Sequence, residues 1–239
     1  MIAARKAGVI AGIPVAVRVF AMIDPTIRVN ARKADGDRVA PGDVVMEMEG
    51  AAASILTAER VALNFLGHLS GIATATAEIV GAVVHTKTRV CDTRKTTPGL
   101  RVLEKYAVRC GGGVNHRMGL YDQVLIKDNH IAAAGGVAAA ILAAKAAAPG
   151  IKIEVEVDTL AQLDAALEIG VDQVLLDNMD PRALREAVMR VAGRAITEAS
   201  GSITKASAPA IAESGVDLMS VGWITHSAPS LDLGLDFLA

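Results

Sequence analysis

The sequence predicts an α/β fold in which parallel strands alternate with helices, preceded by a smaller β-rich region. From residue 88 onward, short apolar strands and helical segments follow one another, and later strands recur about every 20 residues, one βα unit apart. These strands read as near-continuous apolar runs, which is typical of parallel strands covered on both faces. Six such units in series favour a barrel or barrel-like sheet, and a doubly wound open sheet is the alternative.

Residues 1–58 are expected to form the β-rich N-terminal domain. The segments VRVF, IRVNARKADGDRV and DVVMEMEG alternate apolar and polar residues, and ADGD and APGD are turn signals. At TAERVALNFLGHL the apolar period changes from two to that of a helix, and Thr57 is its expected N-cap. The tail, residues 223–239, is expected to turn back to this domain.

Residues 59–222 are expected to form the barrel domain. Asp158, before Thr159, and Asp180, before Pro181, fit N-caps of helices in this domain. The expected strands are TRVCDTRK, DQVLIKDN, IKIEVEVD, VDQVLLDN, RAITEASG and VDLMSVGW.

Composition excludes several kinds of partner. The 239 residues carry a net charge of −2 and only 3% aromatic residues, which favours neither nucleic acid nor an anionic membrane. No apolar run reaches the roughly 18 residues of a membrane span. Cys91 and Cys110 fit neither a metal-binding spacing nor a disulfide framework, so a reducing cytoplasm is the expected location.

Polar residues close all six expected strands. In parallel α/β folds the carboxyl ends of the strands meet at one edge, where active sites lie. A single charged residue there is more often a solvated loop residue or a cap, but core layers need no polar residue at every strand end. The residues in question are Arg94, Lys95, Lys127, Asp128, Asn129, His130, Glu156, Asp158, Asp177, Asn178, Glu198, Ser200, Gly201, Ser202 and Gly222.

The residue types at these ends indicate a ligand with several negative charges. Arg94, Lys95, Arg117 and Lys127 would bind carboxylate or phosphate through charge-assisted hydrogen bonds. The carboxylates that end two consecutive strands suit Mg²⁺ held together with substrate phosphates, although structural ion pairs are an alternative. The turns EASGS and SVGW resemble the late barrel turns that bind phosphate on backbone N–H groups.

The segment GGGVNHRMGLYDQVLIKDNH, residues 111–130, combines a glycine turn with cations on both sides of an apolar strand. His116 and Arg117 follow the glycines, where the main chain can approach a ligand. The sequence therefore predicts a site for a small polyanion, a phosphorylated co-substrate and Mg²⁺.

Longer motifs resemble the quinolinate phosphoribosyltransferase family over residues 5–239. These motifs are AERVALNFLGHLSGIATAT, DTRKTTPGLR, EKYAVRCGGGVNHRMGLYDQVLIKDNHI, EVEVDTL, VLLDNM, EASGSI and GVDLMSVG-ITHS, where the hyphen replaces Trp223. The resemblance implies an open βα barrel of six or seven parallel strands, a smaller β-rich N-terminal domain completed by the C-terminal tail, and a homodimer or larger assembly. Family members usually carry about 40 further residues before the region that matches ARKAGVIAG, and these residues are absent from this sequence.

The implied reaction joins quinolinate to 5-phosphoribosyl 1-pyrophosphate with Mg²⁺, giving nicotinate mononucleotide, pyrophosphate and CO₂ in NAD biosynthesis. By motif, Arg60 would reach into the partner subunit's site and, with Arg94, His116, Arg117 and Lys127, hold the quinolinate carboxylates. Lys95, Glu156 and Asp177 would be the catalytic residues around the ribose and Mg–pyrophosphate, the two carboxylates as metal ligands. The remaining substrate-binding residues would be Thr93, Ser200, Gly201, Ser202, Val221, Gly222 and Trp223.

Two alternatives to this function stay open on the sequence. A related phosphoribosyltransferase could use another substrate, such as nicotinate or that of the molybdenum-transport-associated relatives. A non-catalytic binding protein could keep the fold without turnover. Trp223 stands where the family usually has a smaller residue, at the expected phosphate turn.

Overall fold

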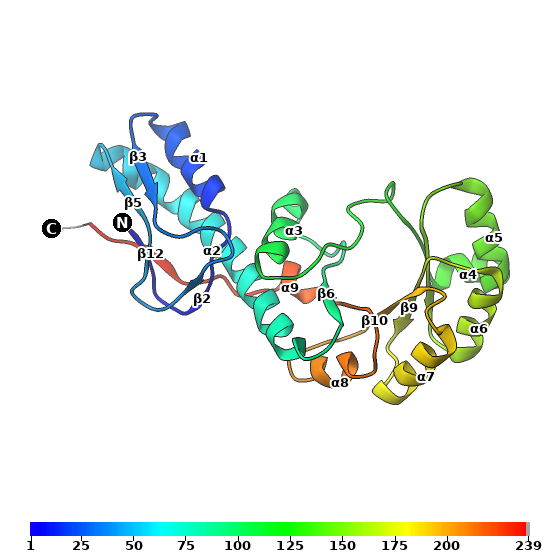
Figure 1. Ribbon diagram of the computed structural model, residues 1–239. Helices are drawn as coiled ribbons and strands as arrows, with labels where there is room; N and C mark the ends of the chain where they lie inside the picture. The colour runs from blue at the N-terminus through cyan, green and yellow to red at the C-terminus, as the bar shows by residue number, and fades with distance from the viewer. Residues whose placement is uncertain (238–239) are drawn as a thin grey trace. The chain divides into compact units, whose positions relative to one another are not determined.

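Contacts group the chain into two units, each described by itself below. The computed structural model describes residues 1–237 (Figure 1). The first unit comprises Met1–Glu78, Lys95–Gly113 and the chain from Trp223 onward, and the second comprises Ile79–Arg94 and Val114–Gly222. The long helix α2 (Ala52–Val83) contributes residues between Ile55 and Leu66 to the core of the first unit, and its last residues, from Ile79, belong to the second.

An antiparallel sheet of four strands forms the frame of the first unit. The C-terminal strand pairs with the first strand, Ala3 opposite Gly234, and the ion pair between Arg5 and Asp236 (2.7 Å) extends this pairing. The β-rich N-terminal region completed by the C-terminal tail is thus confirmed. In order across the sheet, the strands are β12 (Leu233–Leu235), β1 (Ile2–Ala4), β5 (Val44–Glu49) and β3 (Arg28–Ala31), while β2 (Gly8–Val9) pairs separately with β4 (Arg38–Val39).

The prediction that VRVF forms a strand is wrong, because this segment lies in helix α1 (Ile13–Ile23). Pro14 stands in the first turn, where its missing N–H costs nothing. The buried residues Ile13, Ala16 and Phe20 follow helical spacing, so the alternation of Val17, Arg18 and Val19 is incidental.

Helix α2 begins five residues before the expected N-cap, so that prediction is wrong as well. Thr57 lies inside the helix, where its hydroxyl donates to the carbonyl oxygen of Ala53 at 2.8 Å. Leu66 of α2 and Phe20 of α1 belong to one apolar core with residues of the sheet such as Met46. The helices α3 (Arg101–Cys110) and α9 (Trp223–His226) complete the first unit.

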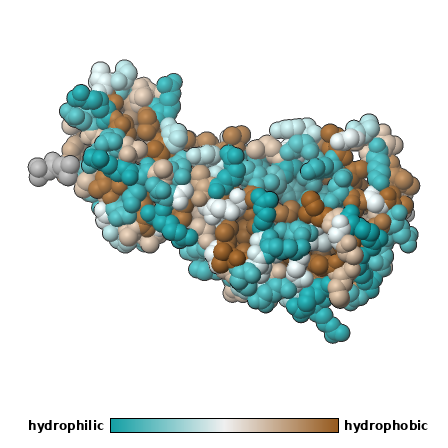
Figure 2. Space-filling model, in the orientation of Figure 1, coloured by the Kyte–Doolittle hydropathy of each residue, from teal (hydrophilic) through white to brown (hydrophobic). Residues whose placement is uncertain are grey.

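Among residues 1–237, α2 is long and apolar enough to span a membrane by length and composition alone. In its most apolar window, however, 61% is buried inside the protein, as in the core helix of a globular unit. Helices α4 (Asp128–Ala134) and α5 (Val137–Ala147) pass the same test only as a pair bent by 93°. Figure 2 shows hydrophilic residues over much of the visible face, with hydrophobic residues in patches between them.

A parallel sheet of six strands forms the second unit, with helices between successive strands (Figure 1). The edge strands of this sheet are β6 and β7, and an isolated parallel bridge joins Cys91 of β6 to Val114, which lies outside β7. The predicted α/β class, with six parallel strands beside a smaller β-rich region, is therefore confirmed. In order, the strands are β6 (Arg89–Cys91), β11 (Leu218–Ser220), β10 (Ile196–Ser200), β9 (Gln173–Asp177), β8 (Ile153–Val157) and β7 (Val124–Ile126), and the later helices are α6 (Leu160–Ile169), α7 (Pro181–Val191) and α8 (Ala208–Ala212).

Caps at the strand-to-helix turns bear on two predictions. Asp180 caps α7 as predicted, because its Oδ1 accepts from the N–H groups of Arg182 and Ala183, both at 2.8 Å. The cap of α6 is Thr159, which accepts from the Gln162 N–H at 3.2 Å, so the prediction for Asp158 is wrong by one residue.

Candidate active site

The carboxyl edge of the parallel sheet carries most of the predicted site residues. Because all six strands run in one direction, their carboxyl ends share this edge. Residues from every strand contribute: Thr93 and Arg94 after β6, Lys127 after β7, Glu156 in β8, Asp177 at the end of β9, Ser200, Gly201 and Ser202 at and after β10, and Val221 and Gly222 after β11.

An ion pair joins the ends of β7 and β8. Lys127 Nζ lies 2.5 Å from Glu156 Oε2, and the Glu156 side chain is only 14% exposed. Lys127 also caps α4, where the ring of His130 accepts from the Lys127 N–H at 2.9 Å. The cation and the carboxylate are therefore held together at the edge where a ligand would enter.

The turns after β9 and β10 pack tightly against each other. Asn178 has a positive φ of 52°, donates from its side chain to Asp177 Oδ2 at 2.6 Å, and donates its N–H to the Ser200 carbonyl oxygen at 2.9 Å. Gly201 has φ 109°, and a Cβ there would lie 2.1 Å from Asn178 Oδ1. Only glycine fits, and Ser202 follows with φ 45°. Such conformations cluster at binding sites.

The main chain around His116 is fixed by a buried carboxylate directly after β6. Asp92 is fully buried, and it accepts from the His116 N–H at 2.9 Å and from the Asn115 side-chain amide at 2.5 Å. The loop that carries His116 and Arg117 is thereby attached to the sheet next to Thr93 and Arg94.

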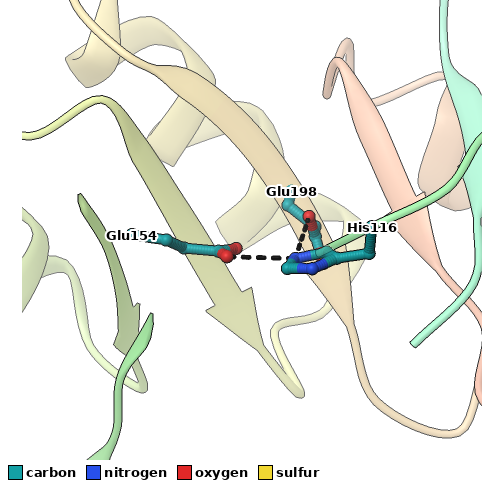
Figure 3. A group of neighbouring side chains, drawn as sticks. All are labelled: His116, Glu154 and Glu198. Carbon is teal, nitrogen blue, oxygen red and sulfur yellow. Dashed lines mark ion pairs between the residues drawn. The ribbon is translucent and has the colours of Figure 1, made fainter. Parts of the chain in front are cut away.

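The imidazole of His116 lies between two buried glutamates (Figure 3). Its Nε2 is 3.0 Å from Glu154 Oε2 and 3.4 Å from Glu198 Oε2, and both carboxylate side chains are completely buried. Burial lowers the pKa of His116, but the hydrogen bonds and charges of Glu154 and Glu198 outweigh it and raise that pKa to about 10. The ring Nδ1 accepts from the Arg117 N–H at 2.7 Å, which favours the neutral ring. In both protonation states Nε2 carries a proton.

Two amides hold the glutamates in place. Gln173 Nε2 donates to Glu154 Oε1 at 2.9 Å and to Glu198 Oε2 at 2.6 Å, and Gln123 Nε2 donates to Glu154 Oε2 at 3.0 Å. Burial raises the pKa of the Glu154 carboxyl, since the charged form loses its hydration, although the hydrogen bond from His116 opposes this shift.

Arg94 and Arg117 are two cations of the second unit that repel each other electrostatically. Burial lowers the pKa of Arg117, and the positive charge of Arg94 lowers it further. Arg117 Nη1 donates to the Gln123 carbonyl oxygen at 2.9 Å, so the side chain is fixed despite this repulsion. Two neighbouring cations at a partly buried position favour a ligand that carries two negative charges.

Metal-ligand geometry favours different residues from those predicted. Among residues 1–237, the ligand atoms of His116, Glu154 and Glu198 form a group within 4.8 Å of one another. The proton on Nε2 opposes metal binding, because a ligating imidazole must offer that lone pair. The predicted metal ligands Glu156 and Asp177 supply carboxylate oxygens at the ends of neighbouring strands, and their role stays a prediction.

A cavity of about 530 Å³ in the second unit is lined by His116, Arg117 and Gln123, together with residues at the amino ends of strands such as Arg89 and Gln173. Glu156, Asp177 and Ser200 are not among its lining residues. We assign the chemistry to the carboxyl edge, because the predicted metal ligands and phosphate turn lie there and not around this cavity.

Three predicted residues belong to the first unit. Arg60 is exposed on α2 and lines a cavity of about 460 Å³ together with the C-terminal segment around Ser230. The main chain of Lys95 is anchored, because its carbonyl oxygen accepts from the Thr225 hydroxyl at 2.7 Å. Trp223 begins α9. The roles expected for these three residues stay predictions.

Sequence reasoning missed Asp92, Glu154, Gln173 and Gln123 as parts of this arrangement. Glu154 lies in the middle of a strand, where no strand-end rule would find it. The alternation in IEVEV was the available signal, since it places Glu154 and Glu156 on the same face of β8.

Family models match nearly all of the chain. The model described as "Quinolinate phosphoribosyl transferase, N-terminal domain" matches residues 1–70, and that described as "Quinolinate phosphoribosyl transferase, C-terminal domain" matches residues 72–236.

Curated proteins and solved structures are also similar to this chain. The "Probable nicotinate-nucleotide pyrophosphorylase [carboxylating]" of Bacillus subtilis is 46% identical over 236 residues, covering 98% of this chain and 82% of that protein. The "Nicotinate-nucleotide pyrophosphorylase [carboxylating]" of Mycobacterium leprae is 49% identical over 237 residues, with 97% and 84% covered. The crystal structure of NadC from Streptococcus pyogenes aligns with a TM-score of 0.96 at 47% identity, covering 99% of this chain and 84% of that one.

Proposed function

The chain belongs to the quinolinate phosphoribosyltransferase family, and from this premise we propose that it transfers the phosphoribosyl group of 5-phosphoribosyl 1-pyrophosphate to quinolinate. The products are nicotinate mononucleotide, pyrophosphate and CO₂. The activity is that of a pentosyltransferase of NAD biosynthesis, the carboxylating nicotinate-nucleotide pyrophosphorylase named for its relatives.

The match of the two family models over residues 1–70 and 72–236 is the observation that carries this proposal, and the cations Arg94 and Arg117 fit the substrate that it implies. Quinolinate bears two carboxylates on adjacent ring carbons, whereas nicotinate bears one. A dianion relieves the repulsion that lowers the pKa of Arg117, and planar guanidinium groups bind carboxylates in pairs of hydrogen bonds. Lys127 extends the positive edge, and Arg60 joins this set by motif alone.

Positioning accounts for the bond-forming step. The bound carboxylates orient the pyridine ring so that its nitrogen faces C1 of the ribose. Holding the two reacting atoms in this geometry lowers the entropic part of the activation barrier. As pyrophosphate leaves, positive charge develops on the sugar, and the carboxylates of Glu156 and Asp177 stabilise that charge. Lys95 is assigned to the leaving anion by motif.

Loss of CO₂ follows from the product of that step. Once the ring nitrogen is bonded to ribose, the positive charge of the pyridinium stabilises the electron pair that stays on the ring carbon as CO₂ leaves, and a proton from water then takes the place of CO₂ on that carbon. The chain needs no covalent nucleophile for this chemistry, and its own residues bind, orient and balance charge.

Magnesium belongs to the proposal as a cofactor. Glu156 and Asp177 offer only oxygen ligands, the donor set that Mg²⁺ prefers when it also binds substrate phosphates. Lys127 pairs with Glu156 Oε2 at 2.5 Å, which keeps this carboxylate ionised as a metal ligand must be. The ion would supply charge neutralisation for the leaving pyrophosphate.

The phosphate end of the co-substrate is assigned to the turns after β10 and β11. Ser200, Gly201 and Ser202 present main-chain N–H groups in a conformation that glycine makes possible, and Val221, Gly222 and Trp223 follow the neighbouring strand. We further propose a homodimer in which Arg60 serves the partner subunit's site, and a cytoplasmic location.

A product assay tests the function directly. Purified protein is mixed with 5-phosphoribosyl 1-pyrophosphate and Mg²⁺, with quinolinate in one reaction and nicotinate in the other. Nicotinate mononucleotide should form from quinolinate alone. Product from nicotinate alone would show that the protein is a related phosphoribosyltransferase with another substrate. Quinolinate binding without any product would support a non-catalytic binding protein.

A further inference from the structure

The ring of His116 is held by a cluster of side chains from three neighbouring strands. Glu154 comes from β8, Gln173 from β9 and Glu198 from β10, and Figure 3 shows the two glutamates directed at the imidazole. Both glutamates are 0% exposed, and the His116 side chain is 8% exposed. We call Glu154, Gln173 and Glu198 the buried triad.

Stability does not explain the buried triad. Two carboxylates lie beside one imidazole in a layer from which water is excluded, and such groups lose more hydration energy than their attraction returns unless the geometry is excellent. Glu198 Oε1 is buried and has no hydrogen-bond partner within the described part of the chain, so the arrangement is not optimised as a core. The opposite face of the same strands is apolar, with Val155, Val174 and Leu176 all at 0% exposure.

The buried triad connects directly to the main chain of the site. Glu154 and Glu198 face Nε2 of His116, while Nδ1 of the same ring accepts from the Arg117 N–H at 2.7 Å. One imidazole therefore joins two buried carboxylates to the residue that carries a substrate-facing guanidinium. Since Asp92 already holds the His116 N–H, the ring provides a second attachment for the same loop.

We propose that Glu154 and Glu198 are positioning residues for the dicarboxylate substrate. They hold the proton-bearing Nε2 of His116, and His116 in turn holds the main chain at Arg117 so that its guanidinium meets the ligand. The inference rests on the proposed function, because a misplaced Arg117 would be detected as a weaker affinity for quinolinate.

Isosteric variants separate this role from a general effect on folding. Glu154→Gln and Glu198→Gln keep side-chain volume but replace a charged acceptor facing Nε2. Each should weaken quinolinate binding, measured by calorimetry without the co-substrate, by about tenfold or more, since hydrogen bonds to charged groups are the strong ones. The KM for 5-phosphoribosyl 1-pyrophosphate should stay within about twofold, because that ligand does not depend on Arg117.

Asp217→Asn is the matched control in the same unit. Asp217 is a partly buried carboxylate that lines the same cavity as His116 but accepts from other donors, Lys87 at 2.7 Å and the Thr197 hydroxyl at 2.8 Å. Its loss should lower the melting temperature and leave quinolinate affinity unchanged. If the glutamine variants do not fold, Glu198→Asp retains the charge but is one methylene shorter, and the same selective loss is expected.

Several outcomes would overturn the inference. Wild-type affinity for quinolinate in both glutamine variants, or an equal loss of both substrates, would leave the buried triad a structural feature only. A transition metal retained by the purified wild type and lost from Glu154→Gln would make the group a metal site instead. A wild-type protein that binds no quinolinate contradicts the proposed function itself, which is a different result from unaffected variants.

Discussion

At the scale of single residues, the site depends on charged groups that lie deeper than charged side chains usually do. Glu154, Glu198 and Asp92 are fully buried, and Arg117 is half-buried with a pKa lowered by burial and by Arg94. The three carboxylates accept hydrogen bonds from side chains or main-chain N–H groups, whereas Arg117 also feels the positive charge of Arg94. A dianionic substrate would offset that repulsion.

Replacing Arg117 with lysine tests the guanidinium pair. Arg117→Lys keeps the charge but loses the planar donor set, so we expect quinolinate affinity to fall by about tenfold or more. The affinity for 5-phosphoribosyl 1-pyrophosphate should change by less than about twofold. Calorimetric titration of each ligand provides both values, and an unchanged quinolinate affinity would show that Arg117 does not bind the substrate.

The charge of the His116 ring determines how stability depends on pH near neutrality. Although burial lowers the pKa of His116, the carboxylates of Glu154 and Glu198 raise it to about 10, above the usual value of 6.5, and a ring governed by them would contribute stability that is complete below the lower value and lost as pH rises through the higher one. The hydrogen bond that Nδ1 accepts from the Arg117 N–H requires a neutral ring instead. Because the positioning role of His116 depends on this contact, we expect no fall in the free energy of unfolding due to His116 between about pH 7 and about pH 9, where a charged ring would give up to about 1.4 kcal/mol per pH unit.

Denaturant unfolding of the wild type and of His116→Gln checks this slope. The variant keeps Glu154 and Glu198 but lacks the imidazole, so a steeper fall with pH in the wild type than in the variant would show that the two carboxylates keep the ring charged. Parallel profiles for the two proteins would show that the Arg117 N–H keeps the ring neutral and that the carboxylates do not govern its charge.

Strand-end residues such as Lys127, Glu156 and Asp177 could be predicted from the sequence, because a polar residue that closes an apolar run is visible in one dimension. Glu154 and Asp92 could not be found in this way. Their roles depend on which side chains face each other across neighbouring strands, and β8 pairs with β9 in a register that no local pattern fixes.

At the scale of elements, the turns after β9 and β10 act as one structure. Asn178, Gly201 and Ser202 all have positive φ, and the Cα of Gly201 lies against the Asn178 side chain. The backbone geometry of these turns requires glycine at position 201. A substitution there is therefore a sensitive test of whether the turn after β10 binds the phosphate.

Gly201→Ala should abolish or strongly weaken binding of 5-phosphoribosyl 1-pyrophosphate. A Cβ at this position would lie 2.1 Å from Asn178 Oδ1, so one of the two turns must move. We expect the KM for this substrate to rise by about tenfold or more while quinolinate affinity is retained. Initial rates at varied substrate concentrations measure the effect.

Gly193→Ala is the control for conformational strain alone. Gly193 has φ 76°, and a methyl group added there would meet no atom of residues 1–237 within 4 Å, so alanine costs about 1 kcal/mol without a clash. A KM unchanged in Gly193→Ala but raised in Gly201→Ala supports the assignment. Equal changes in the two variants would contradict it.

Elements were predicted best where period and tertiary packing agree. The strands of the second unit have apolar runs, and parallel packing buries them on both faces, so all six were recognisable. In α1 the alternation of Val17, Arg18 and Val19 favours a strand, while Ile13, Ala16 and Phe20 need a helix to reach the core. Burial of these side chains in the core determines that the segment is a helix. A short window of sequence does not show which residues the core will bury.

At the scale of the whole molecule, the long motifs of the central block were sufficient to identify the family, and the family models then matched residues 1–70 and 72–236. The grouping into units could not be predicted from the sequence alone. Residues 95–113 lie with the N-terminal sheet although they follow β6 in the chain, because contacts with α2 such as that between His68 and Glu104 (2.9 Å) hold α3 there.

A mixing experiment tests the proposal that Arg60 serves a partner subunit. Arg60→Ala and Lys127→Ala should each be inactive alone. If sites are shared in a dimer, random hybrids contain one intact site in half of the dimers, so co-expression should restore about a quarter of wild-type activity. The assay compares the mixed sample with each variant. Complete inactivity of well-folded hybrids would place both residues in the same subunit's site.

The central claim is that one turnover joins ribose to quinolinate and releases a single carboxylate, and carbon labelling measures this directly. Quinolinate labelled in the carboxyl group next to the ring nitrogen is supplied with 5-phosphoribosyl 1-pyrophosphate and Mg²⁺, and labelled CO₂ and pyrophosphate are followed together. We predict equal amounts of both from the first turnover onward, with neither released by Arg117→Ala. Pyrophosphate without labelled CO₂, or no release of either by a folded protein that binds both substrates, would contradict the account.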